Sequence, residues 1–212
     1  MSLLSPERKH SLAEKAAKFA VNLSDERAVS YLLSRGISLE AAEMFGLGFV
    51  LDDDEYVPGR ISIPYQGRDG VRDIKYRAIN GEEPKYLKEP GCGSNLYNSQ
   101  VLRSAQQVVL CEGELDVIAV QAYCGVPAVA YPGTETWNRN KDDNDTTHWP
   151  LCFEGIPRVW VIADGDGPGR NAAQRVADSI GWSAKVVDLG NGHDANSYIA
   201  QFGATAFKER LK

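Results

Sequence analysis

The sequence predicts an α/β protein in which a parallel sheet flanked by helices follows a mixed α+β part. Beyond Ser104, short apolar stretches alternate with helical patterns, which is typical of a parallel sheet with helices on both faces. Before it, helical patterns give way to stretches with a period of two, which indicate antiparallel strands. The 212 residues, 43% of them hydrophobic, are enough for one or two packed domains.

Three helices are expected in the first third of the chain. Ser5 followed by Pro6 marks the start of the first helix. Ser24 precedes the second, "DERAVSYLLSRG", and Ser38 opens the third, "LEAAEMF". A glycine follows each of the last two patterns and is expected to end the helix there.

Two strands are expected next, in "RISIPY" and "VRDIKYRAI", joined by the turn-rich "QGRDG". Alternation in the second strand places Asp73, Lys75 and Arg77 on one face, and Ile74, Tyr76 and Ala78 on the other. Lys85 follows in "EPKYLKEPG", which the flanking prolines favour as an extended segment.

The second part of the chain reads as strand and helix in alternation. The expected strands are "VVLC", "AVAY", "VWVIAD" and "AKVVDL", and the expected helices are "ELDVIAVQAYCG" and "PGRNAAQRVADSIG". The polar segment 132–157 is expected to be partly loop and partly a short helix without a definite position. We therefore predict two domains, 1–104 and 105–212.

The charge is unevenly distributed. The net charge of −6 argues mildly against a protein that binds nucleic acid over its whole surface. Residues 57–90, however, contain 7 Lys and Arg against 5 Asp and Glu, whereas residues 112–212 contain 9 against 14. A local basic surface in the middle of the chain is therefore compatible with the acidic total.

The sequence contains no pattern typical of a membrane span, a signal peptide or a zinc site. No stretch approaches the roughly 18 apolar residues of a membrane span, and the start lacks the apolar core of a signal peptide. The four cysteines lie far apart, without a CxxC pair or a histidine at finger spacing. We expect a cytoplasmic protein, in a bacterial or phage-infected cell, with reduced, buried thiols and no zinc.

Acidic residues follow three of the predicted strands. Glu112 comes directly after "VVLC", Asp164 and Asp166 follow "VWVIA", and Asp194 comes shortly after "AKVVDL". The carboxyl ends of parallel strands meet at one edge of a sheet, where ligands collect. Carboxylates that converge repel one another unless a cation lies among them, and their hard oxygens suit Mg²⁺ or Mn²⁺. The sequence predicts a divalent-metal site at this edge.

Other interpretations of "DGDGPGR" fit less well. A calcium loop would place Pro168 and Arg175 at its fifth and twelfth positions, where the loop requires a ligand and a bidentate glutamate. A dinucleotide loop would need GxGxxG, and two aspartates would face a pyrophosphate. For the motif alone, a surface turn rich in Asp and Gly remains the alternative.

Four motifs together resemble a known domain. "EGELDVIAV", "GTETW", "DGDGPGR" and "HDANSYI", in this order, are similar to the Toprim domain shared by DnaG-type primases, topoisomerases and some nucleases. Three earlier motifs, "YLLSRGISLEAAEMFGLGF", "GRISIPYQGRDGVRDIKYRAI" and "PKYLKEPG", resemble the basic subdomain that precedes Toprim in DnaG-type and phage primases. Topoisomerases and Toprim nucleases lack that subdomain, so the resemblance, which runs from about Asp25 onward, selects primase.

The resemblance implies the ligands of two or more metal ions. Glu112, Asp164 and Asp166 match the residues that hold the metals, with Asp116 and Asp194 in support.

The resemblance also implies a basic surface. Arg77 and Lys85 match basic residues of the family that face its active site, and we expect Lys75, Arg60 and Arg72 to contact template phosphates.

The sequence departs from the cellular family at several points. Asn196 stands where many members have a second aspartate, and Gly93, Ser94 and Asn95 stand where a lysine is usual. The zinc-binding domain and the helical extension of cellular members have no counterpart in it. These features are similar to a phage-type catalytic core.

The resemblance implies a DNA-directed RNA primase that makes short primers on single-stranded DNA from ribonucleoside triphosphates by two-metal nucleotidyl transfer. No GxxxxGK[ST] helicase motif is present, so a replicative helicase and a zinc-binding module are expected as separate partners. The alternatives are a Toprim-type nuclease and a non-catalytic DNA-binding subunit of a replication complex.

Overall fold

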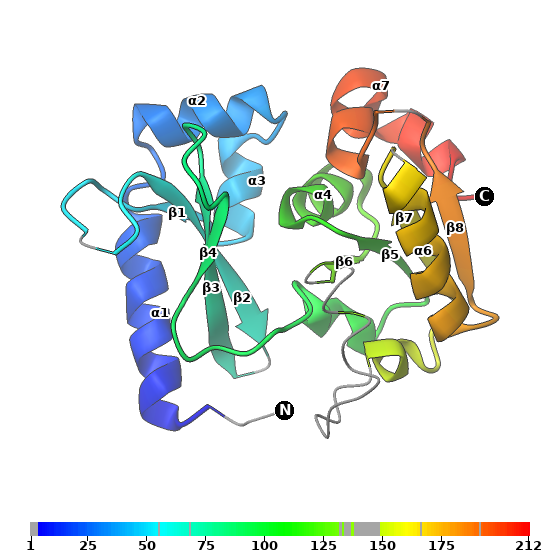
Figure 1. Cartoon of the computed structure of the whole chain (residues 1–212), viewed down its shortest axis with the longest axis horizontal. Helices are drawn as coiled ribbons and strands as arrows, with labels where there is room; N and C mark the ends of the chain where they lie inside the picture. The colour runs from blue at the N-terminus through cyan, green and yellow to red at the C-terminus, as the bar shows by residue number, and fades with distance from the viewer. Residues whose placement is uncertain are drawn as a thin grey trace. The chain divides into compact units, whose positions relative to one another are not determined.

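The computed structural model describes residues 4–54, 56–67, 69–131, 133, 137, 149–165, 167–190 and 192–212. The chain forms two compact units, which divide between Asn95 and Leu96. We call them the amino-terminal and carboxyl-terminal units; Figure 1 labels their helices and strands. The predicted fold class is confirmed: an antiparallel sheet with helices precedes a parallel sheet flanked by helices. The predicted domain boundary between residues 104 and 105 stays a prediction.

The amino-terminal unit contains three helices and an antiparallel sheet of order β1-β2-β3-β4 among its described residues. Its elements are α1 (Pro6–Ala20), α2 (Glu26–Ser34), α3 (Leu39–Met44), β1 (Gly48–Phe49), β2 (Arg60–Gly67), β3 (Gly70–Ala78) and β4 (Tyr86–Lys88). The expected helices and strands are all present. In the β3–β4 pair, Arg77 lies opposite Tyr86 and Lys75 opposite Lys88.

The helix starts follow the predicted capping logic with one change. The hydroxyl of Ser5 accepts a 3.2 Å hydrogen bond from the backbone N–H of Arg8, and Ser38 caps α3 in the same way. At α2 the capping residue is Asp25 rather than Ser24. Its carboxylate accepts a 3.0 Å bond from the backbone N–H of Arg27 and pairs with the guanidinium of the same residue. Aspartate caps as well as serine, and the ion pair favours it here.

The core of this unit lies between α1 and β3. Phe19 of α1 meets Tyr76 of β3 edge to face at 6.0 Å, and Ile74 is buried beside them, as the predicted alternation requires. Glu89, only 3% exposed, accepts hydrogen bonds from the Tyr76 hydroxyl and from Lys15 of α1. Burial by itself would raise the pKa of the Glu89 carboxyl, but these hydrogen bonds outweigh it and lower the pKa. The buried charge is therefore paired and ties α1 to the sheet.

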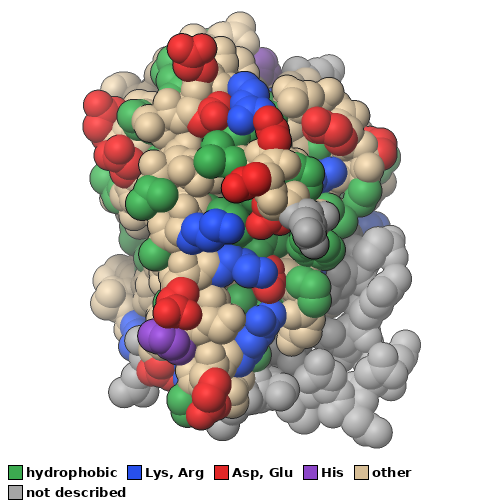
Figure 2. Space-filling model, turned by 90° about the vertical axis from the view of Figure 1, so that its left-hand side faces the viewer, with side chains coloured by type: hydrophobic (Ala, Val, Ile, Leu, Met, Phe, Trp, Pro, Cys, Tyr) green, Lys and Arg blue, Asp and Glu red, His purple; other side chains and the backbone are tan. Residues whose placement is uncertain are grey.

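One face of the amino-terminal unit carries both signs of charge. Figure 2 shows Lys and Arg side chains gathered near the middle of that face, with acidic side chains around them. Several basic side chains of α1 are paired across to the sheet side, as in Arg8 with Glu89 and Lys9 with Asp69. This face is thus not a single-sign surface.

The carboxyl-terminal unit is built on a parallel sheet of order β6-β5-β7-β8. Its elements are η1 (Ser99–Arg103), β5 (Gln107–Cys111), α4 (Glu114–Ala119), η2 (Val120–Cys124), β6 (Ala128–Ala130), η3 (Trp149–Phe153), β7 (Arg158–Ala163), α6 (Gly167–Ile180), β8 (Ala184–Asp188) and α7 (Ala195–Glu209). All four predicted strands are present. Most of segment 132–157 before η3 lies outside the described residues.

Helices pack on both faces of this sheet. Ala173 and Val176 of α6 share a core with Val108, Val159 and Val161 on one face. Alternation turns the neighbouring side chains to the other face, and on that side α4 lies against β5 and β6 and packs on α7.

Two helical features differ from the expectation. The predicted helix "ELDVIAVQAYCG" is α-helical only to Ala119 and continues as a π turn to Cys124, where Gly125 ends it with a φ of 67°. Helix α7 was not expected, and Gly203 interrupts it with a non-helical φ of 85°.

The cysteines and helices bear on two further expectations. All four cysteines lie in the described residues and are free; Cys111 and Cys124 are buried as predicted, but Cys92 is only partly buried and Cys152 is exposed. Within the described part of the chain, no helix has both the length and the apolar character needed to cross a membrane.

Candidate active site

The first predicted acidic motif follows β5, the strand that lies between β6 and β7. Gly113 precedes α4, and a Cβ atom there would lie 2.5 Å from Oδ2 of Asp116. The glycine therefore lets the Asp116 carboxylate fold back over the start of its own helix. Asp116 is only 7% exposed, and its Oδ1 accepts a 2.8 Å hydrogen bond from the backbone N–H of Asn196. Asp116 is thus fixed between α4 and α7.

The second acidic motif follows β7. Asp164 and Gly165 leave the strand, and the carbonyl oxygen of Gly165 accepts a 3.2 Å hydrogen bond from the backbone N–H of Gly192. A Cβ atom on Gly165 would lie 2.5 Å from the backbone nitrogen of His193 and 2.7 Å from the oxygen of Gly190. Only glycine allows this close approach of the two loops. Asp166 lies outside the described residues.

The third motif follows β8. Asp194 is the N-cap of α7: its carboxylate accepts a 2.7 Å bond from the backbone N–H of Ser197, whose hydroxyl accepts from the N–H of Asp194. This reciprocal pair is a capping box. Because the loop before it packs on Gly165, the ends of β7 and β8 are held together at one edge of the sheet.

The charges of three of these carboxylates act on one buried thiol. Cys111 is the last residue of β5 and is buried; burial raises the pKa of its thiol well above the usual value, and the charges of Asp116, Asp164 and Asp194 raise it further. Glu112 comes next in the chain and is partly exposed. The bond of Asp116 to Asn196 and the packing of the loop before α7 on Gly165 link the motifs after β5, β7 and β8. Their role as metal ligands stays a prediction.

A metal site is not complete within the described residues, where no three His, Cys, Asp or Glu side chains form a group able to hold an ion. The chemistry of the donors nevertheless fits Mg²⁺ or Mn²⁺, because carboxylate oxygens are the ligands these ions prefer. Nδ2 of Asn196, a residue 2% exposed, has no hydrogen-bond partner within the described chain. A buried donor of this kind is costly unless an oxygen accepts from it, so a ligand oxygen near the carboxylates would also fit.

In the amino-terminal unit, three of the predicted basic residues gather on one ring that the sequence analysis did not single out. The cationic groups of Lys75, Arg77 and Lys85 lie 4.2, 5.0 and 5.8 Å from the centroid of Tyr86. We call these four residues the Tyr86 cluster. Arg77, 9% exposed, also donates hydrogen bonds to the hydroxyls of Tyr86 and Tyr31. The position of Tyr86 directly after Lys85, in a segment predicted to be extended, was the available signal.

The other two predicted basic residues have separate surroundings. Arg60 is 6% exposed, and its guanidinium donates a 2.8 Å bond to the carbonyl oxygen of Pro84. Arg72 lies against Gly67 at the β2–β3 hairpin. Burial and this bond give Arg60 a structural role; contacts of Arg60 and Arg72 with DNA stay predictions.

Comparison with known proteins identifies the family. Residues 107–205 match the family described as "Toprim domain". "Gene 57 protein" of Mycobacterium phage D29 is 33% identical over 72% of this chain and 98% of its own length, and "DNA primase" of Pseudomonas putida is 28% identical over 89% of this chain. The chain belongs to the DnaG-type and phage primase family. Toprim primases in general use divalent metal ions.

Solved primase cores have the same fold. "Structure of the DnaG primase catalytic domain bound to ssDNA" has a TM-score of 0.76 at 22% identity, over 97% of this chain and 78% of that chain. "Crystal structure of a DNA primase domain from Pseudomonas aeruginosa" has a TM-score of 0.77 at 24% identity, over 96% and 77%. The chain spans 35% of the length of the Pseudomonas putida primase and 41% of that of Haemophilus influenzae.

Proposed function

We propose that this member of the primase family synthesises short RNA primers on single-stranded DNA by two-metal nucleotidyl transfer. The observation that carries the proposal is the linkage of three acidic motifs inside a Toprim domain: Asp116 bonds to the start of α7, and the loop before α7 packs on Gly165. A basic cluster in the preceding subdomain distinguishes the chain from Toprim enzymes that lack such a subdomain.

The carboxylates divide into two groups in this proposal. Glu112, Asp164 and Asp166 would hold the ions, and Asp116 and Asp194, which α7 already orients, would support them. Bound metal ions would lower the pKa of the primer's 3′ hydroxyl and neutralise the phosphates of the triphosphate. The carboxylates would hold the positive charge of the metal ions at the carboxyl edge of the sheet.

The Tyr86 cluster would bind phosphate. Arg77 and Lys85 would hold the triphosphate of a ribonucleotide, and Lys75, with Arg60 and Arg72, would follow the template backbone. Phosphate contacts of this kind need only a local basic surface, so the net charge of −6 does not oppose them. A replicative helicase, a separate zinc-binding module and a cytoplasmic location complete the proposal.

The decisive experiment is primer synthesis by the purified chain. A single-stranded template, the four ribonucleoside triphosphates and Mg²⁺ or Mn²⁺ should yield short RNA, and none without metal. Asp164→Ala should abolish synthesis and weaken Mn²⁺ binding in a direct titration, whereas Asp178→Ala, an exposed change on α6, should alter neither.

The other outcomes separate the alternatives. DNA cleavage without synthesis would overturn the proposal in favour of a Toprim-type nuclease. DNA binding without either reaction, under conditions where Mn²⁺ binds, would favour a non-catalytic replication subunit.

A further inference from the structure

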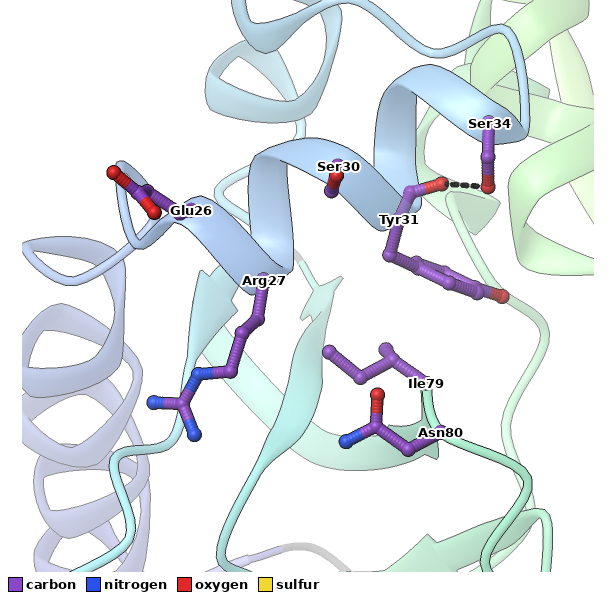
Figure 3. A pocket seen from close by; sticks show the side chains of 7 residues that line it. All are labelled: Glu26, Arg27, Ser30, Tyr31, Ser34, Ile79 and Asn80. Carbon is purple, nitrogen blue, oxygen red and sulfur yellow. Dashed lines mark hydrogen bonds between the residues drawn. The ribbon is translucent and has the colours of Figure 1, made fainter.

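A pocket of about 510 Å³ lies beneath α2 in the amino-terminal unit, apart from the acidic motifs. Its lining comes from α2 and from the two residues that follow β3. In Figure 3, Arg27 and Tyr31 extend from the side of the helix that faces Ile79 and Asn80, with the Arg27 guanidinium turned to the left, and Glu26 points away. The volume is in the range of pockets that bind small organic groups.

The lining is polar but nearly neutral. Tyr31 supplies an aromatic ring, Ile79 an aliphatic side chain, and Ser30 and Asn80 a hydroxyl and a carboxamide. The positive charge of Arg27 is already offset, because its guanidinium contacts Asp25 at 3.0 Å and Asp52 at 2.8 Å. A free anion would therefore gain little here, and a neutral heterocycle with hydrogen-bonding edges fits better.

The pocket is connected to the Tyr86 cluster through one residue. Tyr31 lines the pocket, and its hydroxyl accepts a hydrogen bond from Arg77, whose guanidinium also lies 5.5 Å from the Tyr31 ring. Arg77 is largely buried, and its two hydroxyl partners are neutral. A ligand with a planar heterocycle beside a phosphate matches this order of groups, because the heterocycle meets the pocket and the phosphate meets the cations.

We propose that the pocket beneath α2 binds a nucleobase, with Tyr31 and Ile79 as its apolar contacts and Ser30 and Asn80 as its hydrogen-bonding groups. The identity of the ligand rests on the proposed function. The base belongs either to single-stranded DNA or to a ribonucleoside triphosphate, and both present the same chemistry. Phosphate contacts do not distinguish bases, so a pocket of this kind would supply the base-dependent part of binding.

The test compares oligothymidylate with an abasic oligomer of the same length. The unmodified chain should bind the first about tenfold more tightly, which is within the range that one base–aromatic contact contributes. Ser30→Trp fills the pocket from an exposed position of α2 and should remove this difference. Leu33→Trp adds the same bulk on an exposed part of α2 outside the pocket, and should retain it.

A second arm replaces DNA with each ribonucleoside triphosphate and with inorganic triphosphate. Tighter binding of nucleotide than of triphosphate, lost in Ser30→Trp alone, would place a ribonucleotide base in the pocket. If Ser30→Trp and Leu33→Trp showed the same base-dependent binding of DNA and of nucleotides, the proposal would be overturned. Asn80→Leu should weaken base-dependent binding without changing its salt dependence, which a general loss of structure would not do.

This result is separable from the outcome for primer synthesis. Base-dependent binding without synthesis would overturn the proposed function and keep the pocket. Primer synthesis, with no effect of Ser30→Trp on base-dependent binding, would support the proposed function and overturn the nucleobase pocket.

Discussion

Asp116 accepts a hydrogen bond from the backbone N–H of Asn196 at 2.8 Å, across 80 residues of sequence. Asp194 satisfies the N–H of Ser197 one position further along the same helix start. Two carboxylates from different strand ends therefore cap α7 together, and a favourable interaction with the helix N-terminus stabilises both negative charges. The helix orients these side chains without any ion.

Asp116→Ala should destabilise the carboxyl-terminal unit. The change leaves the buried N–H of Asn196 without an acceptor, which costs about 1–3 kcal/mol. Urea unfolding followed by circular dichroism measures the loss. Glu154→Ala, at an exposed position of the same unit, should change the free energy of unfolding little. Equal effects of the two changes would show that the bond does not stabilise the fold.

Gly165→Ala should separate the loop after β7 from the loop before α7. Its Cβ atom would meet backbone atoms of Gly190 and His193, and such overlap costs about 1–3 kcal/mol or forces the loops apart. We expect lower stability in thermal unfolding and less primer synthesis. Gly167→Ala is the matched control in the same motif, because a Cβ atom there has no neighbour within 4 Å among the described residues. If Gly165→Ala changed neither thermal stability nor primer synthesis, the close approach of the two loops at Gly165 would be contradicted.

Asp73 should make stability fall as the pH rises. Burial raises the pKa of its carboxyl from 3.8 to about 6, against hydrogen bonds from the Cys92 thiol and the N–H of Ile74. Between these values the folded state holds a proton that the unfolded chain has released, so stability is lost as the pH rises through the folded-state pKa. Asp73→Asn removes this titration.

The expected difference is measurable by denaturation at several pH values. From pH 4 to 6.5, the free energy of unfolding of the unmodified chain should fall by about 2 kcal/mol relative to Asp73→Asn. Asp53→Asn, at an exposed loop position, should follow the unmodified chain. Parallel profiles for the unmodified chain and Asp73→Asn would refute a raised pKa.

Lys85→Ala should weaken binding to single-stranded DNA in a salt-dependent way. If Lys85 contacts a phosphate, the slope of log K against log salt should decrease by about 0.7. Lys18→Ala removes the same charge from an exposed position of α1 and should leave the slope unchanged. Fluorescence anisotropy between low and moderate salt gives the slopes, and identical slopes for the two variants would exclude a phosphate contact by Lys85.

The sequence predicted the strands well because parallel strands are buried on both faces and leave apolar runs such as "VWVIA". It also placed Glu112, Asp164 and Asp194 at strand ends, since their positions follow directly from those runs. Helix α7 was missed because Gly203 breaks its periodicity and its start had been interpreted as a site motif. The bond between Asp116 and Asn196 joins distant segments, and no local pattern predicts such a contact.

Contacts between distant segments also limited the prediction for the basic residues. Their charge and alternation were visible in the sequence, and the shared face of Lys75 and Arg77 is confirmed by their common neighbour. The role of Tyr86 and Tyr31 was not visible, because it depends on strand register and on the placement of α2. Arg77, which alternation placed on the same face as Lys75, is nearly buried between two rings, and no local pattern indicated this.

The arrangement around Tyr86 has an entropic consequence. Lysine and arginine side chains normally sample many rotamers in water, and a ligand that immobilises them must offset that loss. Here a single phenol ring restrains three such side chains before any polyanion arrives. Tyr86→Ala would therefore leave every positive charge in place and still reduce affinity, because the preorganisation of those charges would be gone.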